Sequence, residues 1–264
     1  MTLKREIPMW WPREKGGCSL CIETQAECDN RCPECPRTLD PTRSRFRDGE
    51  PIRDQMSTKM VLDLLRQARD MGWTGPVHFS HYSEPLLDPR YVSFVNAAVR
   101  YGLKPELYTN GNHLSVDIIK KIDGIVDYIV ISFRTPGTQD YWQSKFKKSK
   151  VNTCESYHVL IWNPNKPLLE RAINDAKGKP CVGPLFSAFR INYDGQMSMC
   201  YADFNNEFKL LNAKDHSLEE MWFGDEHVNA VKEMSRLGAR DGRKLCRECP
   251  EVYPDGGYYV PVVK

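Results

Sequence analysis

The chain has 264 residues, of which 41% are hydrophobic and 27% charged, so its composition is that of a chain with a buried core, not of a disordered one. The formal net charge of +2 does not suggest a dedicated nucleic-acid-binding protein. The longest strongly apolar run, residues 128–133, is far shorter than the ~18 residues of a membrane helix, and residues 1–17 contain no signal-peptide core. We therefore expect a soluble cytoplasmic protein without a membrane partner, in which the ten cysteines stay reduced.

Helical and strand-like patterns alternate from residue 57 to residue 176. In residues 57–71, apolar side chains recur at the spacing of one face of an amphipathic helix. Residues 128–132 are almost wholly apolar, as in a strand covered on both faces. The same reasoning predicts helices at 91–101, 115–122 and 168–176, and strands at 77–80, 106–109 and 157–162. This alternation predicts an α/β fold of right-handed βαβ units around a parallel sheet, closed or partly closed into a barrel.

The pattern changes after about residue 178. Two strand-like runs, 188–193 and 196–201, flank an Asp-Gly pair and predict a β-hairpin. A helix is expected from 218 to 237, with Ser217 and Glu220 forming a capping box at its start. We therefore predict a core domain over residues 1–178 and a smaller module over 179–264, which has little core of its own and needs a staple.

Three cysteines near the N-terminus, Cys28, Cys32 and Cys35, have the spacing C-x3-C-x2-C. A loop this short can turn three thiolates toward one point. A cubane iron–sulfur cluster normally takes four cysteines, so three would leave one iron open, as in a catalytic metal site. A zinc site or a chance spacing is the alternative, although zinc sites usually pair two C-x2-C knuckles.

This cysteine motif and three further segments resemble the radical S-adenosylmethionine (SAM) enzymes over roughly residues 18–165. The motif follows a first strand and precedes a first helix, as in that family. A Ser-His-Tyr-Ser-Glu-Pro segment ending at Pro85 follows the second strand, where the family usually has Gly-Gly-Glu-Pro. A Tyr-Thr-Asn-Gly turn containing Asn110 closes the third strand like the family's "TNG" turn, and Ser132 ends the fourth strand.

The resemblance implies a partial (β/α)6 TIM-like barrel and a 4Fe-4S cluster on the three cysteines. It also implies that SAM binds the open iron and yields a 5′-deoxyadenosyl radical, which removes a hydrogen atom from a substrate. The residues expected to lie against SAM are Ser83, Glu84, Asn110 and Ser132. A carboxylate such as that of Glu84 can accept hydrogen bonds from the SAM ammonium group. For Asn110 and Ser132, turn and strand-end roles are equally open.

A second cysteine set lies in the C-terminal module: Cys181, Cys200, Cys246 and Cys249. Four thiolates can close a cluster with no open site and supply the missing staple. Their order resembles the Twitch and SPASM extensions of radical SAM enzymes. No cysteine follows Cys249, so this resemblance implies one auxiliary 4Fe-4S cluster, the Twitch arrangement. A four-cysteine zinc site is the main alternative. For Cys18, Cys21 and Cys154, packing is the default role.

Substrate-facing residues are expected at the carboxyl ends of the strands. That rule selects His81, Tyr82, Arg134, His158 and Trp162. Arg134 can bind a carboxylate or phosphate or form a structural salt bridge, and His81 can act as a base or be a satisfied loop histidine. Tyr201, beside Cys200, can face the substrate or cover the auxiliary cluster. With Arg134 and His81, it completes the predicted catalytic set.

A basic run, Arg37, Arg43, Arg45 and Arg47, can dock an acidic flavodoxin- or ferredoxin-type electron donor, or simply be a solvated loop. The function we predict is the dehydrogenation of a small molecule, with the auxiliary cluster as electron acceptor. Two alternatives stay open: modification of a peptide or protein, and a non-enzymatic iron–sulfur or zinc protein.

Overall fold

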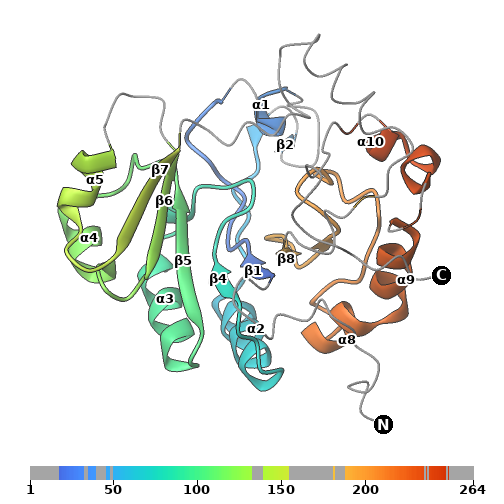
Figure 1. Cartoon of the computed structure of the whole chain (residues 1–264), viewed down its shortest axis with the longest axis horizontal. Helices are drawn as coiled ribbons and strands as arrows, with labels where there is room; N and C mark the ends of the chain where they lie inside the picture. The colour runs from blue at the N-terminus through green and yellow to red at the C-terminus, as the bar shows by residue number, and fades with distance from the viewer. Residues whose placement is uncertain are drawn as a thin grey trace.

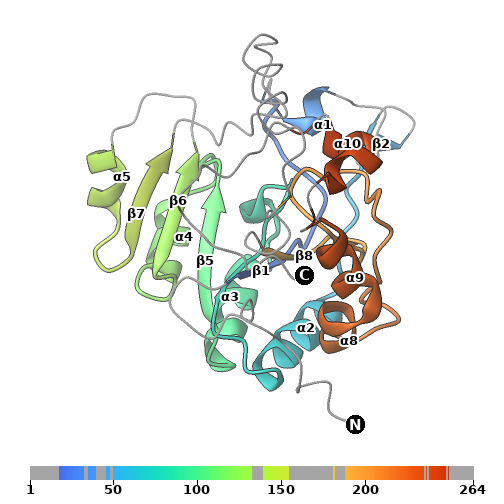
Figure 2. The ribbon, with the colours of Figure 1, turned by 45° about the vertical axis from the view of Figure 1, so that its right-hand side comes forward.

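The computed structural model describes residues 18–32, 35–39, 46–47, 50–132, 139–154, 181, 188–234, 236, 238–247 and 249. Seven of its strands form one sheet in the order β7-β6-β5-β4-β1-β8-β9, and β2 and β3 form a small separate pair. In Figures 1 and 2, α4 and α5 lie beside β6 and β7 at one end of this sheet, whereas α8, α9 and α10 lie together at the other end.

The elements follow one another along the chain as strand–helix units. The strands are β1 (Ser19–Ile22), β2 (Phe46–Arg47), β3 (Glu50–Pro51), β4 (Pro76–His78), β5 (Lys104–Thr109), β6 (Tyr128–Ser132), β7 (Lys150–Cys154), β8 (Ala188–Ile191) and β9 (Met197–Ser198). The helices are α1 (Pro36–Leu39), α2 (Thr58–Asp70), η2 (Pro85–Leu87), α3 (Tyr91–Arg100), α4 (Val116–Ile122), α5 (Gln139–Lys145), α8 (Leu218–Phe223), α9 (Asp225–Met234), η4 (Ala239–Gly242) and α10 (Lys244–Arg247).

All neighbouring strands from β7 to β8 pair in parallel, and only β9 is antiparallel to its neighbour β8. The predicted parallel α/β sheet is therefore confirmed. Because the strands run the same way, the segments that follow β1, β4, β5 and β6 leave the sheet at one shared edge. That edge carries the candidate site.

Side-chain caps start the helices at the predicted positions. The hydroxyl groups of Ser57 and Ser115 accept hydrogen bonds from the first turns of α2 and α4, and Ser217 and Glu220 form the predicted capping box of α8. The predicted helix over 218–237 is wrong in one respect, because the chain leaves the helical conformation at Gly224 and forms two helices, α8 and α9.

The C-terminal hairpin continues the main sheet. Strand β8 pairs with β1 along its whole length, from Ser19 opposite Ala188 to Ile22 opposite Ile191. The buried ring of Trp222 on α8 lies 4.6 Å from that of Phe189 on β8 and 5.9 Å from that of Trp73. Burial of these large rings joins the C-terminal segment to the core of the N-terminal strands. The hairpin is therefore stabilised by shared packing in addition to any metal.

Candidate cofactor and substrate site

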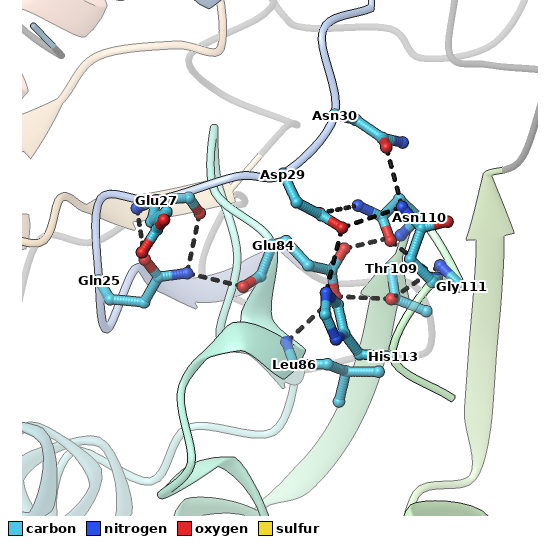
Figure 3. Close-up of polar contacts among 11 residues, drawn as sticks. Gln25, Glu27, Asp29, Asn30, Glu84, Leu86, Thr109, Asn110, Gly111 and His113 are labelled. Carbon is cyan, nitrogen blue, oxygen red and sulfur yellow. Dashed lines mark hydrogen bonds and ion pairs between the residues drawn. The ribbon is translucent and has the colours of Figure 1, made fainter. Parts of the chain in front are cut away.

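Glu84 is the carboxylate at the centre of the shared strand edge (Figure 3). Its Oε1 accepts hydrogen bonds from the Thr109 hydroxyl at 2.6 Å and the Leu86 amide at 3.1 Å, and its Oε2 accepts one from the Asn110 amide at 2.7 Å. The residue is only 2% exposed, and this burial raises its pKa against the opposing effect of the three hydrogen bonds. Glu84 thus ties the loop after β4 to the end of β5.

The backbone of Glu84 makes a second connection, to the segment after β1. Its amide donates to the Glu27 carbonyl at 2.9 Å, and its carbonyl accepts from Nε2 of the buried Gln25 at 2.6 Å. The segment after β1 leads directly into Cys28. The three chain segments that the sequence assigned to a SAM site therefore meet around one buried glutamate.

The first cysteine set lies in the loop between β1 and α1, as predicted. Cys28, Cys32 and Cys35 are half-buried reduced thiols, and the Cys35 amide donates to the Cys32 carbonyl at 2.9 Å. Burial, with smaller contributions from the negative charges of Glu84 and Cys35, raises the pKa of the Cys28 thiol to about 12. These charges act on Cys28 only because Glu84 and Cys35 lie near it. A thiolate in such surroundings needs a bound cation to be stable, which is the chemistry of a cluster ligand.

Ser83 supplies an independent test of whether this edge fits SAM. Its side chain is 9% exposed, and its Oγ has no hydrogen-bond partner among the residues that the structure describes. A buried hydroxyl without a partner is costly, and a polar ligand would relieve that cost. Its place next to Glu84 therefore fits the amino-acid portion of SAM.

Asn110 and Ser132 both have roles in the protein itself. The Asn110 side chain donates to Asp29, which directly follows Cys28, at 2.7 Å. The Ser132 hydroxyl donates to the carbonyl of Thr109 at 3.4 Å, so it joins the ends of β5 and β6. Sequence reasoning missed Asp29, whose other partners are Asn112 and His113.

The loop after β4 also reaches the C-terminal module. The His81 ring contacts Asn192 Oδ1 through Nδ1 at 3.0 Å and stacks on the Tyr82 ring at 3.9 Å. The Tyr82 hydroxyl donates to the backbone carbonyl of Tyr201. The Tyr82 amide donates to the buried Glu23 at 2.9 Å. Predicted substrate residues from the two halves of the chain are therefore in direct contact.

The second cysteine set converges from separate segments of the module. The Cys181 amide donates to the carbonyl of Met234, and Cys246 and Cys249 are joined by an amide–carbonyl contact of 3.3 Å at the end of α10. Burial raises the pKa of the Cys200 thiol, and the nearby charges of Asp203, Cys181 and Cys249 raise it further. Cys181 and Cys249, two of the other predicted ligands, therefore both lie near Cys200.

Within the described ranges, no three His, Cys, Asp or Glu side chains are arranged as the site of a single metal ion. A cubane holds its cysteines at separate corners, farther apart than the ligands of one ion. Each set offers thiolate sulfur as its donor, which is the donor that iron–sulfur clusters take.

Arg190 on β8 is a further residue that sequence reasoning missed. Its side chain is 8% exposed, donates from Nη1 to the Ala188 carbonyl at 3.1 Å, and lies 5.9 Å from the centre of the Tyr201 ring. Its charge lowers the pKa of the Cys200 thiol, opposing the effect of burial. The local sequence carries no signal that this buried cation lies near Cys200.

Some predicted residues lie outside the described part of the chain: Arg43, Arg45, Arg134, His158 and Trp162. Arg37 corrects one expectation, because its side chain is 4% exposed and donates to the Ala26 carbonyl. It therefore supports the loop after β1 and is not available to dock an electron donor. Cys18 and Cys21 are buried in or beside β1, and the Cys21 thiol donates to the Ser80 carbonyl at 2.7 Å.

Comparisons with known proteins agree with this geometry. Residues 181–250 match the SPASM family, described as an iron–sulfur cluster-binding domain. The chain is 24% identical to the S-adenosyl-L-methionine-dependent 2-deoxy-scyllo-inosamine dehydrogenase of Niallia circulans, over 88% of this chain and 92% of that protein.

Two solved structures show the fold. The structure of BtrN in complex with AdoMet and 2-DOIA has a TM-score of 0.68 and 18% identity, and the match covers 89% of this chain and 93% of BtrN. The structure of anSMEcpe with AdoMet and the Cp18Cys peptide has a TM-score of 0.51 and 13% identity, over 88% of each chain.

No helix in the described ranges is both long enough and apolar enough to cross a bilayer. The family match places an iron–sulfur cluster-binding segment over all four predicted C-terminal cysteines. The chain is thus related in sequence and fold to radical SAM enzymes, with a SPASM domain at residues 181–250.

Proposed function

We propose that this chain is a radical SAM oxidoreductase that dehydrogenates a small molecule. The observation that carries the proposal is that the loop of Cys28, the carboxylate of Glu84 and the turn at Asn110 meet at one edge of the sheet. The loop that contains Glu84 also contacts the C-terminal segment, because Tyr82 donates a hydrogen bond to the carbonyl of Tyr201, the residue after Cys200. The named activity of the Niallia circulans relative supports the reaction type. We place the boundary between the barrel core and the cluster module near residues 178–181.

The residues present fit the implied cofactors. Cys28, Cys32 and Cys35 would hold one 4Fe-4S cluster, and Cys181, Cys200, Cys246 and Cys249 would hold a second one. Ser83 and Glu84 would lie against bound SAM. With its cluster, SAM supplies the means to remove a hydrogen atom from an unactivated C–H bond.

The remaining residues hold the site together and handle protons. Glu84 fixes the turn at Asn110, and the buried Glu23 fixes the backbone at Tyr82. Because Asn192 Oδ1 accepts from His81 Nδ1, the His81 ring is held with Nε2 as its basic nitrogen, which can take the proton of a substrate hydroxyl group. Tyr201, whose carbonyl accepts a hydrogen bond from Tyr82, is proposed to face the substrate from the C-terminal segment. Arg134 is proposed, on the sequence alone, as an anchor for a carboxylate or phosphate group of the substrate.

The substrate class we favour is a secondary alcohol on a sugar or an aminocyclitol ring. The relative is named for 2-deoxy-scyllo-inosamine, and the BtrN structure contains 2-DOIA. A cytoplasmic location and an acidic flavodoxin- or ferredoxin-type donor complete the proposal, since the thiols must stay reduced.

The test is anaerobic reconstitution with iron, sulfide, SAM and dithionite. We expect formation of 5′-deoxyadenosine, its loss in Cys32→Ala, and oxidation of at least one member of an aminocyclitol panel. A colourless protein that forms no 5′-deoxyadenosine would overturn the proposal in favour of a non-enzymatic protein.

A second candidate is the modification of a peptide. The fold similarity to anSMEcpe, whose structure contains a peptide, favours it. Under this alternative, SAM cleavage would be stimulated by a short Cys- or Ser-containing peptide and not by any cyclitol, and the product would show a mass change on the peptide.

A further inference from the structure

Asp29 joins the cysteine loop to the turn after β5 through three side-chain contacts (Figure 3). Its Oδ1 accepts from Asn110 Nδ2 at 2.7 Å, and its Oδ2 accepts from Asn112 Nδ2 at 3.0 Å and contacts His113 Nε2 at 3.1 Å. Asp29 is the residue next to Cys28. Asn30, the next residue of the cysteine loop, makes one further contact with the same turn, to Asn112.

Asn110 is locked in the orientation that presents a donor to Asp29. Its Oδ1 already accepts the Asn112 backbone amide at 2.9 Å, so its Nδ2 must face Asp29. Asn112 Nδ2 donates to Asn30 Oδ1 at 2.9 Å as well as to Asp29. A carboxylate at residue 29 can accept from Asn110, Asn112 and His113 at once.

Asn110 connects this contact to the buried glutamate. Its backbone amide donates to Glu84 while its side chain donates to Asp29, so one residue is held by two carboxylates from two loops. The Asp29 side chain is 32% exposed. Burial acts to raise its pKa, but the hydrogen bonds from Asn112, Asn110 and His113 lower it overall.

We propose that Asp29 is a positioning residue, which holds the three-cysteine loop in register with the Asn110 turn and thereby sets the affinity for SAM. The inference rests on the proposed function, because the loop and the turn are the two sides of the proposed SAM site. Groups that orient metal ligands typically change metal affinity or activity by roughly 10- to 100-fold when they are removed.

The experiment compares Asp29→Asn with the swapped double variant Asp29→Asn/Asn112→Asp in the reconstituted full chain. Asp29→Asn removes the negative charge that strengthens all three contacts, and its NH₂ group faces the side-chain NH₂ group of Asn112. The double variant restores a donor–acceptor pair between the two positions, since Asn30 can turn its amide to donate and His113 Nε2 can accept as well as donate. Asp63→Asn is the matched control, because Asp63 is a surface aspartate on α2 that pairs with Lys59.

The readouts are SAM affinity by equilibrium dialysis, the change in the EPR signal of the reduced cluster on adding SAM, and iron per chain. We expect Asp29→Asn to keep its iron but to bind SAM about tenfold or more weakly, with an altered EPR change. The double variant should recover most of the affinity, and Asp63→Asn should match the wild type.

Two results would overturn the inference. One is wild-type SAM affinity and an unchanged EPR signal in Asp29→Asn, and the other is an Asp29→Asn defect that the double variant does not reduce. If the wild-type protein itself binds no SAM, the proposed function fails instead, so the two failures are distinguishable.

Discussion

The guanidinium group of Arg190 lies 5.9 Å from the centre of the Tyr201 ring, and Tyr201 directly follows the predicted cluster ligand Cys200. A cluster held by four thiolates becomes more negative on reduction. A buried positive charge nearby stabilises the reduced form more than the oxidised one. Arg190 is therefore placed to make the C-terminal cluster a better electron acceptor.

Replacing Arg190 by Met should lower the midpoint potential of the C-terminal cluster by tens of millivolts, on the order of the interaction between two partly screened unit charges. Arg190→Lys keeps the charge and should retain most of the potential. An EPR-monitored redox titration in a Cys28→Ala/Cys32→Ala/Cys35→Ala background reads this cluster alone. Equal potentials in the Met and Lys variants, with iron intact, would contradict the electrostatic role.

Iron content separates the two cysteine sets. With two cubanes, the wild-type protein should contain about eight irons, and Cys32→Ala and Cys246→Ala should each contain about four. Cys21→Ala is the control, because the Cys21 thiol donates to the Ser80 carbonyl and is not a proposed ligand. About four irons together with one zinc in the wild type would mean that the C-terminal site is structural.

Local signals in the sequence predicted much of this fold. The Ser217 capping box, the apolar run of β6 and the Asn110 turn depend on neighbouring residues, so the spacing of side chains was enough to place them. Strand β7 was missed because Lys150–Cys154 has only one large aliphatic residue and lies at the end of the described sheet. The break at Gly224 was missed because the amphipathic pattern continues through it.

The sequence predicted those residues of the candidate site that belong to local motifs. It did not predict those whose role depends on contacts between distant parts of the chain. The cysteines and Glu84 stand in recognisable spacings. Asp29 accepts a hydrogen bond from Asn110, which is 81 positions away in the sequence, and no local sequence pattern predicts that contact. Arg37 was misjudged for the same reason, since its burial against the Ala26 carbonyl depends on tertiary packing.

His78 on β4 should make stability depend on pH. Its burial and, to a smaller extent, the charge of Arg190 lower its pKa from 6.5 to about 4, with a contact to the Ser80 carbonyl opposing them. In the unfolded chain His78 is protonated below pH 6.5, whereas in the folded protein it is protonated only below about pH 4. Between these values the unfolded state binds more protons, so the free energy of unfolding falls as the pH falls.

The loss between pH 7 and pH 5 should be about 2 kcal/mol at most, from 1.36 kcal/mol per pH unit below the unfolded pKa. Urea unfolding at the two pH values measures it. His78→Gln, which cannot titrate, should show a smaller loss than the wild type. An equal loss in both proteins would mean that other groups carry the pH dependence.

Glu84→Gln should weaken both the fold and the binding of SAM. Each carboxylate oxygen faces a backbone amide, Leu86 at Oε1 and Asn110 at Oε2, so an amide NH₂ at either place leaves a buried N–H without an acceptor. One such unsatisfied group costs about 1–3 kcal/mol in the free energy of unfolding. The variant also lacks the negative charge that would attract the SAM ammonium group. Urea unfolding and equilibrium dialysis with SAM measure the two effects separately.

The matched control is Glu233→Gln, which removes an exposed glutamate that pairs with Arg243 at 3.4 Å. Exposed pairs of this kind contribute about 0–1 kcal/mol, so this variant should unfold almost like the wild type and bind SAM normally. If Glu84→Gln behaved like the control in unfolding, the three hydrogen bonds of Glu84 would not hold β5 to the loop after β4. If it lost stability but kept its SAM affinity, Glu84 would act only through the fold, and Ser83 would be left as the polar side chain of this loop that meets the ligand.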